Sequence, residues 1–186
     1  MSQRSAEHHM LFSSSLIYVA SADLPGKAAS GLAASPSRKG RLRIICCGGD
    51  GGWVRFLFDW GGSGATKAVL LNYSHGYGGG GPGTKGVILT NRRATYLPDA
   101  HLVVSGHIHE RWTLDLQRVR INSGGKVYHD TQTHVVVPTY KEEYGDGYGG
   151  WHVERGAPPK PTGAAWLRFH WSPKTHRVRY DVTWAQ

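Results

Sequence analysis

The chain has 186 residues, enough for one domain with its own hydrophobic core. Its 22 Lys and Arg against 13 Asp and Glu give a formal charge of +9, which favours polyanionic partners such as nucleic acid or phosphorylated molecules. Seven Trp and nine Tyr are typical of a packed β-rich protein and disfavour a chain that is disordered throughout.

The sequence also argues against a membrane-spanning protein, a secreted protein and a cysteine-based metal or redox site. No apolar run approaches the length of a membrane span, and the one candidate signal peptide, MLFSSSLIYVASA, is interrupted by three serines. The two cysteines, Cys46 and Cys47, are adjacent and form no C-x-x-C metal or redox pattern. We therefore expect a cytoplasmic protein without a membrane partner.

Residues 1–40 differ in composition from the rest of the chain. They are rich in Ser, Ala and Gly, contain no Trp, and end in the linker-like stretch GKAASGLAASPSRKG, residues 26–40. From residue 41 onward, short apolar runs alternate with glycine-rich turns. We predict a low-complexity, disordered arm over residues 1–40 and one folded domain over residues 41–186.

Within the domain the pattern predicts mostly strands, so we expect a β-rich α+β fold. The terminal pair alternates clearly, since Val178, Tyr180 and Val182 share one face of the predicted strand. One short helix is predicted in GVILTNRRATYLP, stopped by Pro98. The predicted strands, in chain order, are RLRIICC (41–47), WVRFLFDW (53–60), KAVLLNYSH (67–75), AHLVVSGH (100–107), WTLDLQRVRIN (112–122), KVYHDTQTHVVVPTY (126–140), AAWLRFHWS (164–172) and HRVRYDVTW (176–184).

The glycine-rich segment SHGYGGGGPGTKG, residues 74–86, allows a phosphate-loop interpretation. From Gly78 the spacing to Gly83 matches such a loop, but Thr84 and Lys85 follow in the reverse of the required order. We also predict no strong helix after it whose N-terminus would bind phosphate. Nucleotide binding by a phosphate loop is therefore the weaker interpretation of this segment.

Three histidines follow apolar strands and are candidates for a metal site. His75 ends the run AVLL, while His107 and His109 come directly after LVVSG. On extended backbone, residues two apart point to the same side, so both later imidazoles would converge on one volume. Imidazole is a common ligand of zinc, iron, nickel and copper. For the other histidines we expect surface or hydrogen-bonding roles: His8, His9, His101, His129, His134, His152, His170 and His176.

The motifs around these histidines resemble a known family. SGHIHE, residues 105–110, looks like the Gly-His-x-His motif of the calcineurin-like metallophosphoesterases. NYSHGYGG (72–79) is similar to the His-Gly element upstream of it, and RINSGG (120–125) to the segment that follows. The resemblance covers about residues 41–186 and corresponds to the C-terminal half of that family's domain.

The resemblance implies a sandwich of two β-sheets flanked by helices, with two divalent metal ions (manganese, iron or zinc) at the strand ends. His75 and His107 would bind one ion and His109 the other. A water or hydroxide between the ions would then attack phosphorus, so the implied activity is hydrolysis of phosphomonoesters or phosphodiesters. Arg92 and Arg93 are candidates for binding the substrate phosphate, with a solvated surface role as the alternative.

The chain departs from the family pattern in its carboxylates. No Asp-x-His element precedes His75, where the family pattern has one, and no Asn-His element occurs in the sequence; Gly49-Asp50 is a weak match that we interpret as a turn. Two cations about 3.5–4 Å apart need an anion between them, and three imidazoles carry no negative charge. We therefore expect a binuclear centre only if carboxylates are supplied from elsewhere, for example by a complementary N-terminal half chain.

Two alternatives remain from the sequence. One is a basic β-rich module that binds nucleic acid through charge and exposed aromatic residues such as Trp151, and the other is a pseudoenzyme fragment with neither property. The loop KEEYGDGYGGWHVERGAPPKP, residues 141–161, is a candidate recognition or substrate-shaping loop, with a surface insertion as the alternative.

Overall fold

The computed structural model describes residues 8–12, 17–21, 41–48, 50–59, 66–79, 81, 83–142, 144, 151–172 and 177–185. Strands dominate these ranges, so the predicted β-rich α+β class is confirmed. The elements in chain order are β1 (His8–Phe12), β2 (Ile17–Ser21), β3 (Arg41–Gly48), β4 (Gly51–Asp59), β5 (Thr66–Ser74), α1 (Val87–Tyr96), β6 (Leu102–Ser105), β7 (Trp112–Ile121), β8 (Val127–Val136), α2 (Trp151–Glu154), β9 (Ala164–Ser172) and β10 (Arg177–Ala185).

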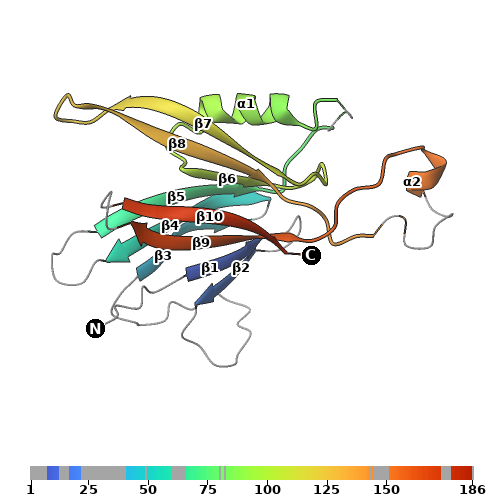
Figure 1. Ribbon diagram of the computed structural model, residues 1–186, viewed down its shortest axis with the longest axis horizontal. Helices are drawn as coiled ribbons and strands as arrows, with labels where there is room; N and C mark the ends of the chain where they lie inside the picture. Colours follow the sequence, from blue (N-terminus) through green and yellow to red (C-terminus); the bar gives the residue numbers. More distant parts are fainter. Residues whose placement is uncertain are drawn as a thin grey trace.

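The strands form two sheets that face each other (Figure 1). The larger sheet is mixed and has the order β3-β4-β5-β6-β8-β7, with β6 parallel to both of its neighbours. The smaller sheet is antiparallel and has the order β10-β9-β1-β2. Helix α1 connects β5 to β6, as a parallel pair requires, and lies on the outer face of the mixed sheet beside β6, β7 and β8 (Figure 1).

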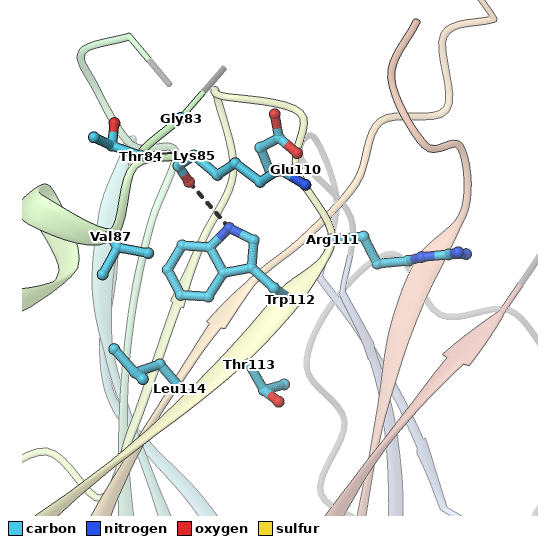
Figure 2. Close-up of a pocket in the computed structure, with 9 residues that line it drawn as sticks. All are labelled: Gly83, Thr84, Lys85, Val87, Glu110, Arg111, Trp112, Thr113 and Leu114. Carbon is cyan, nitrogen blue, oxygen red and sulfur yellow. Dashed lines mark hydrogen bonds between the residues drawn. The ribbon is translucent and has the colours of Figure 1, made fainter. Parts of the chain in front are cut away.

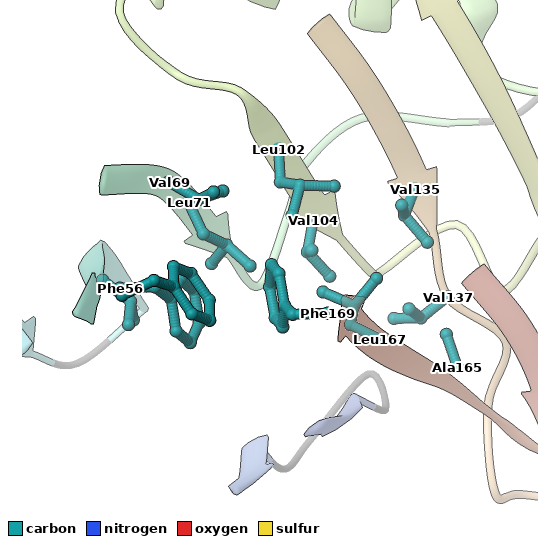
Figure 3. Packing of buried hydrophobic residues seen from close by; sticks show 12 residues of the cluster. Phe56, Val69, Leu71, Leu102, Val104, Val135, Val137, Ala165, Leu167 and Phe169 are labelled. Carbon is teal, nitrogen blue, oxygen red and sulfur yellow. The ribbon is translucent and has the colours of Figure 1, made fainter. Parts of the chain in front are cut away.

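The hydrophobic core lies between the two sheets (Figure 3). Phe169 of β9 packs on Phe56 and Phe58 of β4, with ring centroids 4.7 and 5.5 Å apart. Burying one such ring contributes about 1.5–3 kcal/mol. Alternate residues of each strand supply the rest of the cluster, as expected for strands covered on one face by another sheet. Its remaining members are Val54, Val69, Leu71, Leu102, Val104, Val135, Val137, Ala165 and Leu167.

A buried polar layer joins α1 to the outer face of the mixed sheet. Gln132 of β8 donates hydrogen bonds to the carbonyl oxygens of Leu97 (2.7 Å) and Ala100 (3.0 Å), at the end of α1 and just beyond it. Its own amide oxygen accepts a hydrogen bond from His134 Nε2 at 3.0 Å. Buried polar groups are tolerated only when they are paired in this way. The layer therefore sets where the helix ends against the sheet.

The edge strand β7 is attached to the rest of the sheet by a second polar cluster. Arg118 makes a bidentate ion pair with Asp130 of β8, at 2.8 and 2.9 Å. The same guanidinium donates to the carbonyl oxygens of Pro98 and Ala100 in the turn after α1. A planar guanidinium with several donors is suited to this combination of contacts. Strand β7 and the end of α1 are thus held at one point.

The structure agrees with the predicted elements beyond residue 41. Each predicted strand is present, the predicted helix is α1, and it ends two residues before Pro98. Val178, Tyr180 and Val182 pack against the core, while the alternate residues of β10 are exposed, as predicted. His101 and His134 are hydrogen-bonded as expected, the former accepting from the Leu70 N–H. No helix in the described ranges is long and apolar enough to cross a membrane.

Some predictions concern parts that the structure describes partly or not at all. Strands β1 and β2 lie within residues 1–40, where a disordered arm is predicted, and β1 pairs with β9. The linker-like stretch 26–40, His176 and the side chains of His8, His9 and Trp151 lie outside the described residues. The boundary at residue 41 coincides with the start of β3, and the division into arm and domain stays a prediction.

The buried His134 makes stability depend on pH. Burial, with the charges of Arg93 and Arg118 adding to it, lowers the pKa of His134 from 6.5 to about 4. The unfolded chain takes up a proton below about pH 6.5, whereas the folded protein keeps this imidazole neutral until about pH 4. The free energy of unfolding should therefore fall by up to about 3 kcal/mol as the pH is lowered through this window.

Urea unfolding at several pH values between 7 and 4.5 measures this effect (roughly the window in which a histidine titrates). His101, whose pKa is also lowered by burial, contributes in the same direction. His134→Gln should therefore reduce the slope without abolishing it. An equal slope for His134→Gln and the wild type would show that His134 is not a source of the pH dependence.

Candidate metal-binding site

The candidate site lies at one edge of the mixed sheet, where β5 and β6 both end. These two strands are parallel, with Ser74 opposite Ser105, so the residues that follow them emerge side by side. The Gly106 N–H donates to the carbonyl oxygen of His75 at 3.0 Å, which extends the pairing beyond the strands. On its other side the His75 N–H donates to the Asp50 carbonyl at 2.6 Å. The backbone of His75 is therefore held between two neighbouring turns.

This arrangement brings His75 and His107 into contact. His75 Nε2 and His107 Nδ1 are 3.2 Å apart, and the two rings meet edge to face with centroids 5.2 Å apart. Which nitrogen donates depends on the tautomers. Both side chains are exposed, so the pair is accessible from solvent. Two of the three predicted ligands thus come together although 32 residues separate them in the sequence.

Gly76 makes the close approach of the two turns possible. Its φ of +100° lies where side chains are rarely tolerated. A Cβ atom at this position would also lie 2.7 Å from the Gly106 carbonyl oxygen and 3.1 Å from His107 Cβ. Because both contacts involve the turn that carries His107, any larger residue at position 76 would push the two histidines apart.

The backbone at His107 and His109 differs from the sequence-based expectation. Strand β6 ends at Ser105, and the two histidines have φ values of +71° and +55°. The expectation of extended backbone through both residues was therefore wrong, and they lie in a turn. Lys85 (φ +45°) is the one other non-glycine residue with positive φ in the described ranges. Such conformations cost about 1–3 kcal/mol each and concentrate at functional sites.

The complete ligand set proposed from the sequence stays a prediction. Within the described ranges, no group of three or more His, Cys, Asp or Glu side chains is arranged to hold a metal ion. His75 and His107 form the pair, and His109 lies two residues further along the same turn. Asp50 lies in the turn between β3 and β4, as the sequence indicates, and contacts His75 through its backbone carbonyl.

Of the two predicted phosphate-binding arginines, Arg92 is exposed and Arg93 is buried. Arg93 faces the sheet with 6% of its surface exposed, and its guanidinium carbon lies 5.0 Å from the centre of the Tyr77 ring. The Tyr77 hydroxyl lies 3.1 Å from that of Tyr96, and this hydrogen bond, with the nearby arginines, lowers the pKa of Tyr77. In this position the Arg93 guanidinium packs against Tyr77 and so supports the loop that follows His75.

A pocket of about 300 Å³ adjoins the two turns (Figure 2). One wall is the glycine-rich loop before α1, with Thr84 and Lys85, and the other is the start of β7. The indole of Trp112 stands between them and donates a hydrogen bond to the Lys85 carbonyl oxygen at 3.0 Å. The helix that follows the glycine-rich loop is α1, the short helix predicted there, which begins at Val87.

A buried ion pair connects the long polar loop to this site. Glu110, directly after the histidine turn, pairs with Lys160, and the two side chains are only 12% and 17% exposed. The sequence carries no sign of this pairing, because 50 positions separate the two residues and no local pattern relates them. The contact of Trp112 with the Lys85 carbonyl is likewise not visible in the sequence, because 27 positions separate the two residues. The pairing ties the end of the loop 141–161 to the turn that carries His107 and His109.

No family model, no curated protein and no solved structure matches this chain.

Substitution of Gly76 by alanine should separate the paired histidines. We expect Gly76→Ala to reduce the free energy of unfolding by about 1–3 kcal/mol, through the positive φ and the contact with the Gly106 carbonyl. Gly79→Ala is a matched control, because no atom lies within 4 Å of its Cβ position. Urea unfolding of both variants measures the difference, and equal stabilities would contradict the proposed close approach.

Breaking the Glu110–Lys160 pair should loosen the loop that it holds. Glu110→Gln or Lys160→Met should each destabilise this contact by about 2 kcal/mol, because a charge-assisted hydrogen bond is lost in a mostly buried place. Hydrogen exchange of the Ala157, Lys160, Thr162 and Gly163 amides measures the loosening, with Lys141→Met at an exposed position as the control. In the double variant the two losses should not add. Purely additive effects would show that the residues are not coupled.

Proposed function

We propose that this protein is a divalent-metal-dependent phosphoesterase of the calcineurin-like type, representing the C-terminal half of that sandwich. The observation that carries the proposal is the contact between His75 and His107 at the ends of two adjacent parallel strands. The left-handed backbone at His107 and His109 supports it, because strained conformations persist mainly where function requires them. The resemblance of residues 72–79 and 105–110 to motifs of that family implies hydrolysis of phosphomonoesters or phosphodiesters.

The distance between the two histidines is compatible with binding one ion. Two nitrogens at about 2.0–2.1 Å from the same ion lie about 3.2 Å apart when the N–metal–N angle is roughly 100°. The observed separation of His75 Nε2 and His107 Nδ1 is 3.2 Å. His109 is the next candidate ligand on the same turn. The described residues thus fit part of the shell of a single manganese, iron or zinc ion.

The described residues do not fit a centre of two ions. Two adjacent cations require a bridging anion, and no carboxylate in the described ranges joins the histidines in a metal-holding group. We therefore propose that a second ion binds only when carboxylates come from a complementary chain or segment. Activity of this chain by itself is accordingly expected to be weak or absent.

Protein side chains around the pair would bind and orient the substrate. A bound ion supplies Lewis-acid activation of the phosphoryl group. Lys85 and Arg111, on the loops that continue from the two turns, carry positive charges that attract a phosphate ester, and Arg92 is exposed on α1. Arg93 has a supporting role under Tyr77. We assign no general acid or base.

A non-enzymatic function is favoured by a different surface. On β9 and β10, Arg168, Arg177 and Arg179 are exposed on the face directed away from the core, with Asp181 as an acidic neighbour. A positively charged sheet face of this kind is suited to binding a polyanion such as nucleic acid. This second candidate, and that of an inactive fragment, differ from the first in predicting no uptake of metal by the histidine pair.

Metal titration of the full chain tests the proposal. Calorimetry with Mn²⁺ or Zn²⁺ should show binding to the wild type, and His107→Ala should weaken it at least about tenfold, because one of the few ligands is lost. His129→Ala, at an exposed position on β8, is the matched control and should bind like the wild type. Hydrolysis of an aryl phosphodiester with added manganese provides the second measurement.

Two outcomes would reject the proposal. The first is that the wild type takes up neither metal. The second is equal affinity of the wild type and His107→Ala, since bound metal would then lie elsewhere. Salt-sensitive DNA binding without any metal uptake would favour the sheet-face alternative.

A further inference from the structure

The pocket beside the histidine turns has a composition that the metal site does not require. Trp112, Val87 and Leu114 form its apolar part, with the two aliphatic side chains on one side of the indole (Figure 2). Thr84 and Thr113 add hydroxyl groups, and Lys85 adds a positive charge. An aromatic face, hydrogen-bonding groups and a cation within one pocket suit a ligand that combines a flat ring with a phosphate.

The indole is held in a fixed orientation. Its Nε1–H donates to the Lys85 carbonyl at 3.0 Å, and Lys85 itself has positive φ. The side chain of Trp112 is half-buried, so part of the ring stays accessible. An aromatic group that is already oriented loses little conformational entropy when a ligand stacks on it. The hydrogen bond therefore prepares a stacking surface.

The charges at the pocket favour an anion. The carboxylate of Glu110 is paired with Lys160, which reduces its effect on Lys85. Arg111 is exposed, and its side chain points away from the pocket (Figure 2). Together with the net charge of +9, this arrangement favours a strand of linked phosphates.

The size of the pocket limits what it can hold. A volume of about 300 Å³ is at the lower end for ligand sites and suits one base with its sugar and phosphate. Its walls also continue directly from the two turns of the site, since Glu110 follows the histidine turn and Lys85 lies on the loop after His75. A nucleotide in the pocket would thus lie next to the histidine pair.

We infer that this pocket binds one nucleotide unit of a single-stranded nucleic acid, with its base against Trp112 and its phosphate facing Lys85. As a statement of substrate class this rests on the proposed function, because it makes a nucleic-acid phosphodiester the ester presented to the histidine pair. The binding itself does not depend on metal.

Anisotropy of a labelled single-stranded DNA of about 12 nucleotides, with the full chain and a chelator present, tests the inference. Trp112→Leu should weaken binding about tenfold, whereas Trp112→Phe, which keeps an aromatic ring, should retain most of it. Lys85→Met should weaken binding and reduce the salt dependence by about one phosphate contact. Lys126→Met, at the opposite end of the β7–β8 hairpin, is the control for loss of one positive charge.

Competition with small molecules identifies the part of the ligand that is bound. AMP should displace the strand more effectively than ribose 5-phosphate or inorganic phosphate, because these lack the base. Equal competition by inorganic phosphate would overturn the inference, as would wild-type affinity in both Trp112→Leu and Lys85→Met. Binding of AMP that depends on Trp112, without binding of the strand, would refute the nucleic-acid part.

Failure of the inference can be separated from failure of the proposed function. DNA binding is measured with the chelator present and metal uptake in a separate titration, because the pocket lies beside the histidine pair and does not include it. A protein that binds the strand through Trp112 but takes up no metal would retain this inference and lose the phosphoesterase proposal. Metal uptake without Trp112-dependent binding of the strand would retain the phosphoesterase proposal and reject this inference.

Discussion

The parallel pairing of β5 with β6 is the constraint on which the rest of the site depends. The carboxyl ends of antiparallel neighbours lie at opposite edges of a sheet. Because β5 and β6 are parallel, His75 and the turn with His107 lie at the same edge. Parallel pairing in turn requires a crossover, and α1 provides it on the outer face. The contact between the imidazoles is thus a consequence of strand direction, and the glycine at position 76 lets the two turns come close enough to make it.

Helix α1 is held by polar contacts more than by an apolar face. Its buried residues are Thr90 and Arg93, and it meets a sheet surface that contains Gln132 and His134. Such a layer gives less stability per area than an apolar one, but its hydrogen bonds are directional and determine one position for the helix. That precision matters here, because the loop leading into α1 forms one wall of the pocket, and Arg93 lies under Tyr77 next to the histidines.

The same turn connects three parts of the molecule with different chemistry. His107 contacts His75 in the candidate metal-binding pair, Glu110 pairs with Lys160 at the end of the polar loop, and Trp112 begins the edge strand and forms the centre of the pocket. Six residues therefore join a candidate ligand site, a candidate recognition loop and a candidate binding pocket. Left-handed backbone at His107 and His109 gives this short segment the sharp turns that it needs.

The sequence by itself determined the strands from residue 41 onward, helix α1 and the strand ends at which histidines occur, because alternation, glycine-rich turns and the proline after α1 depend on neighbouring residues only. It also made His75 and His107 candidate ligands of one ion, through motifs that resemble those of a known family. The tertiary structure alone decided that their rings touch, that His107 and His109 leave extended backbone, that Arg93 is buried, and that Glu110 meets Lys160. Those features depend on sheet order and on which turns meet across 32 to 50 residues of chain, and no local pattern carries that information.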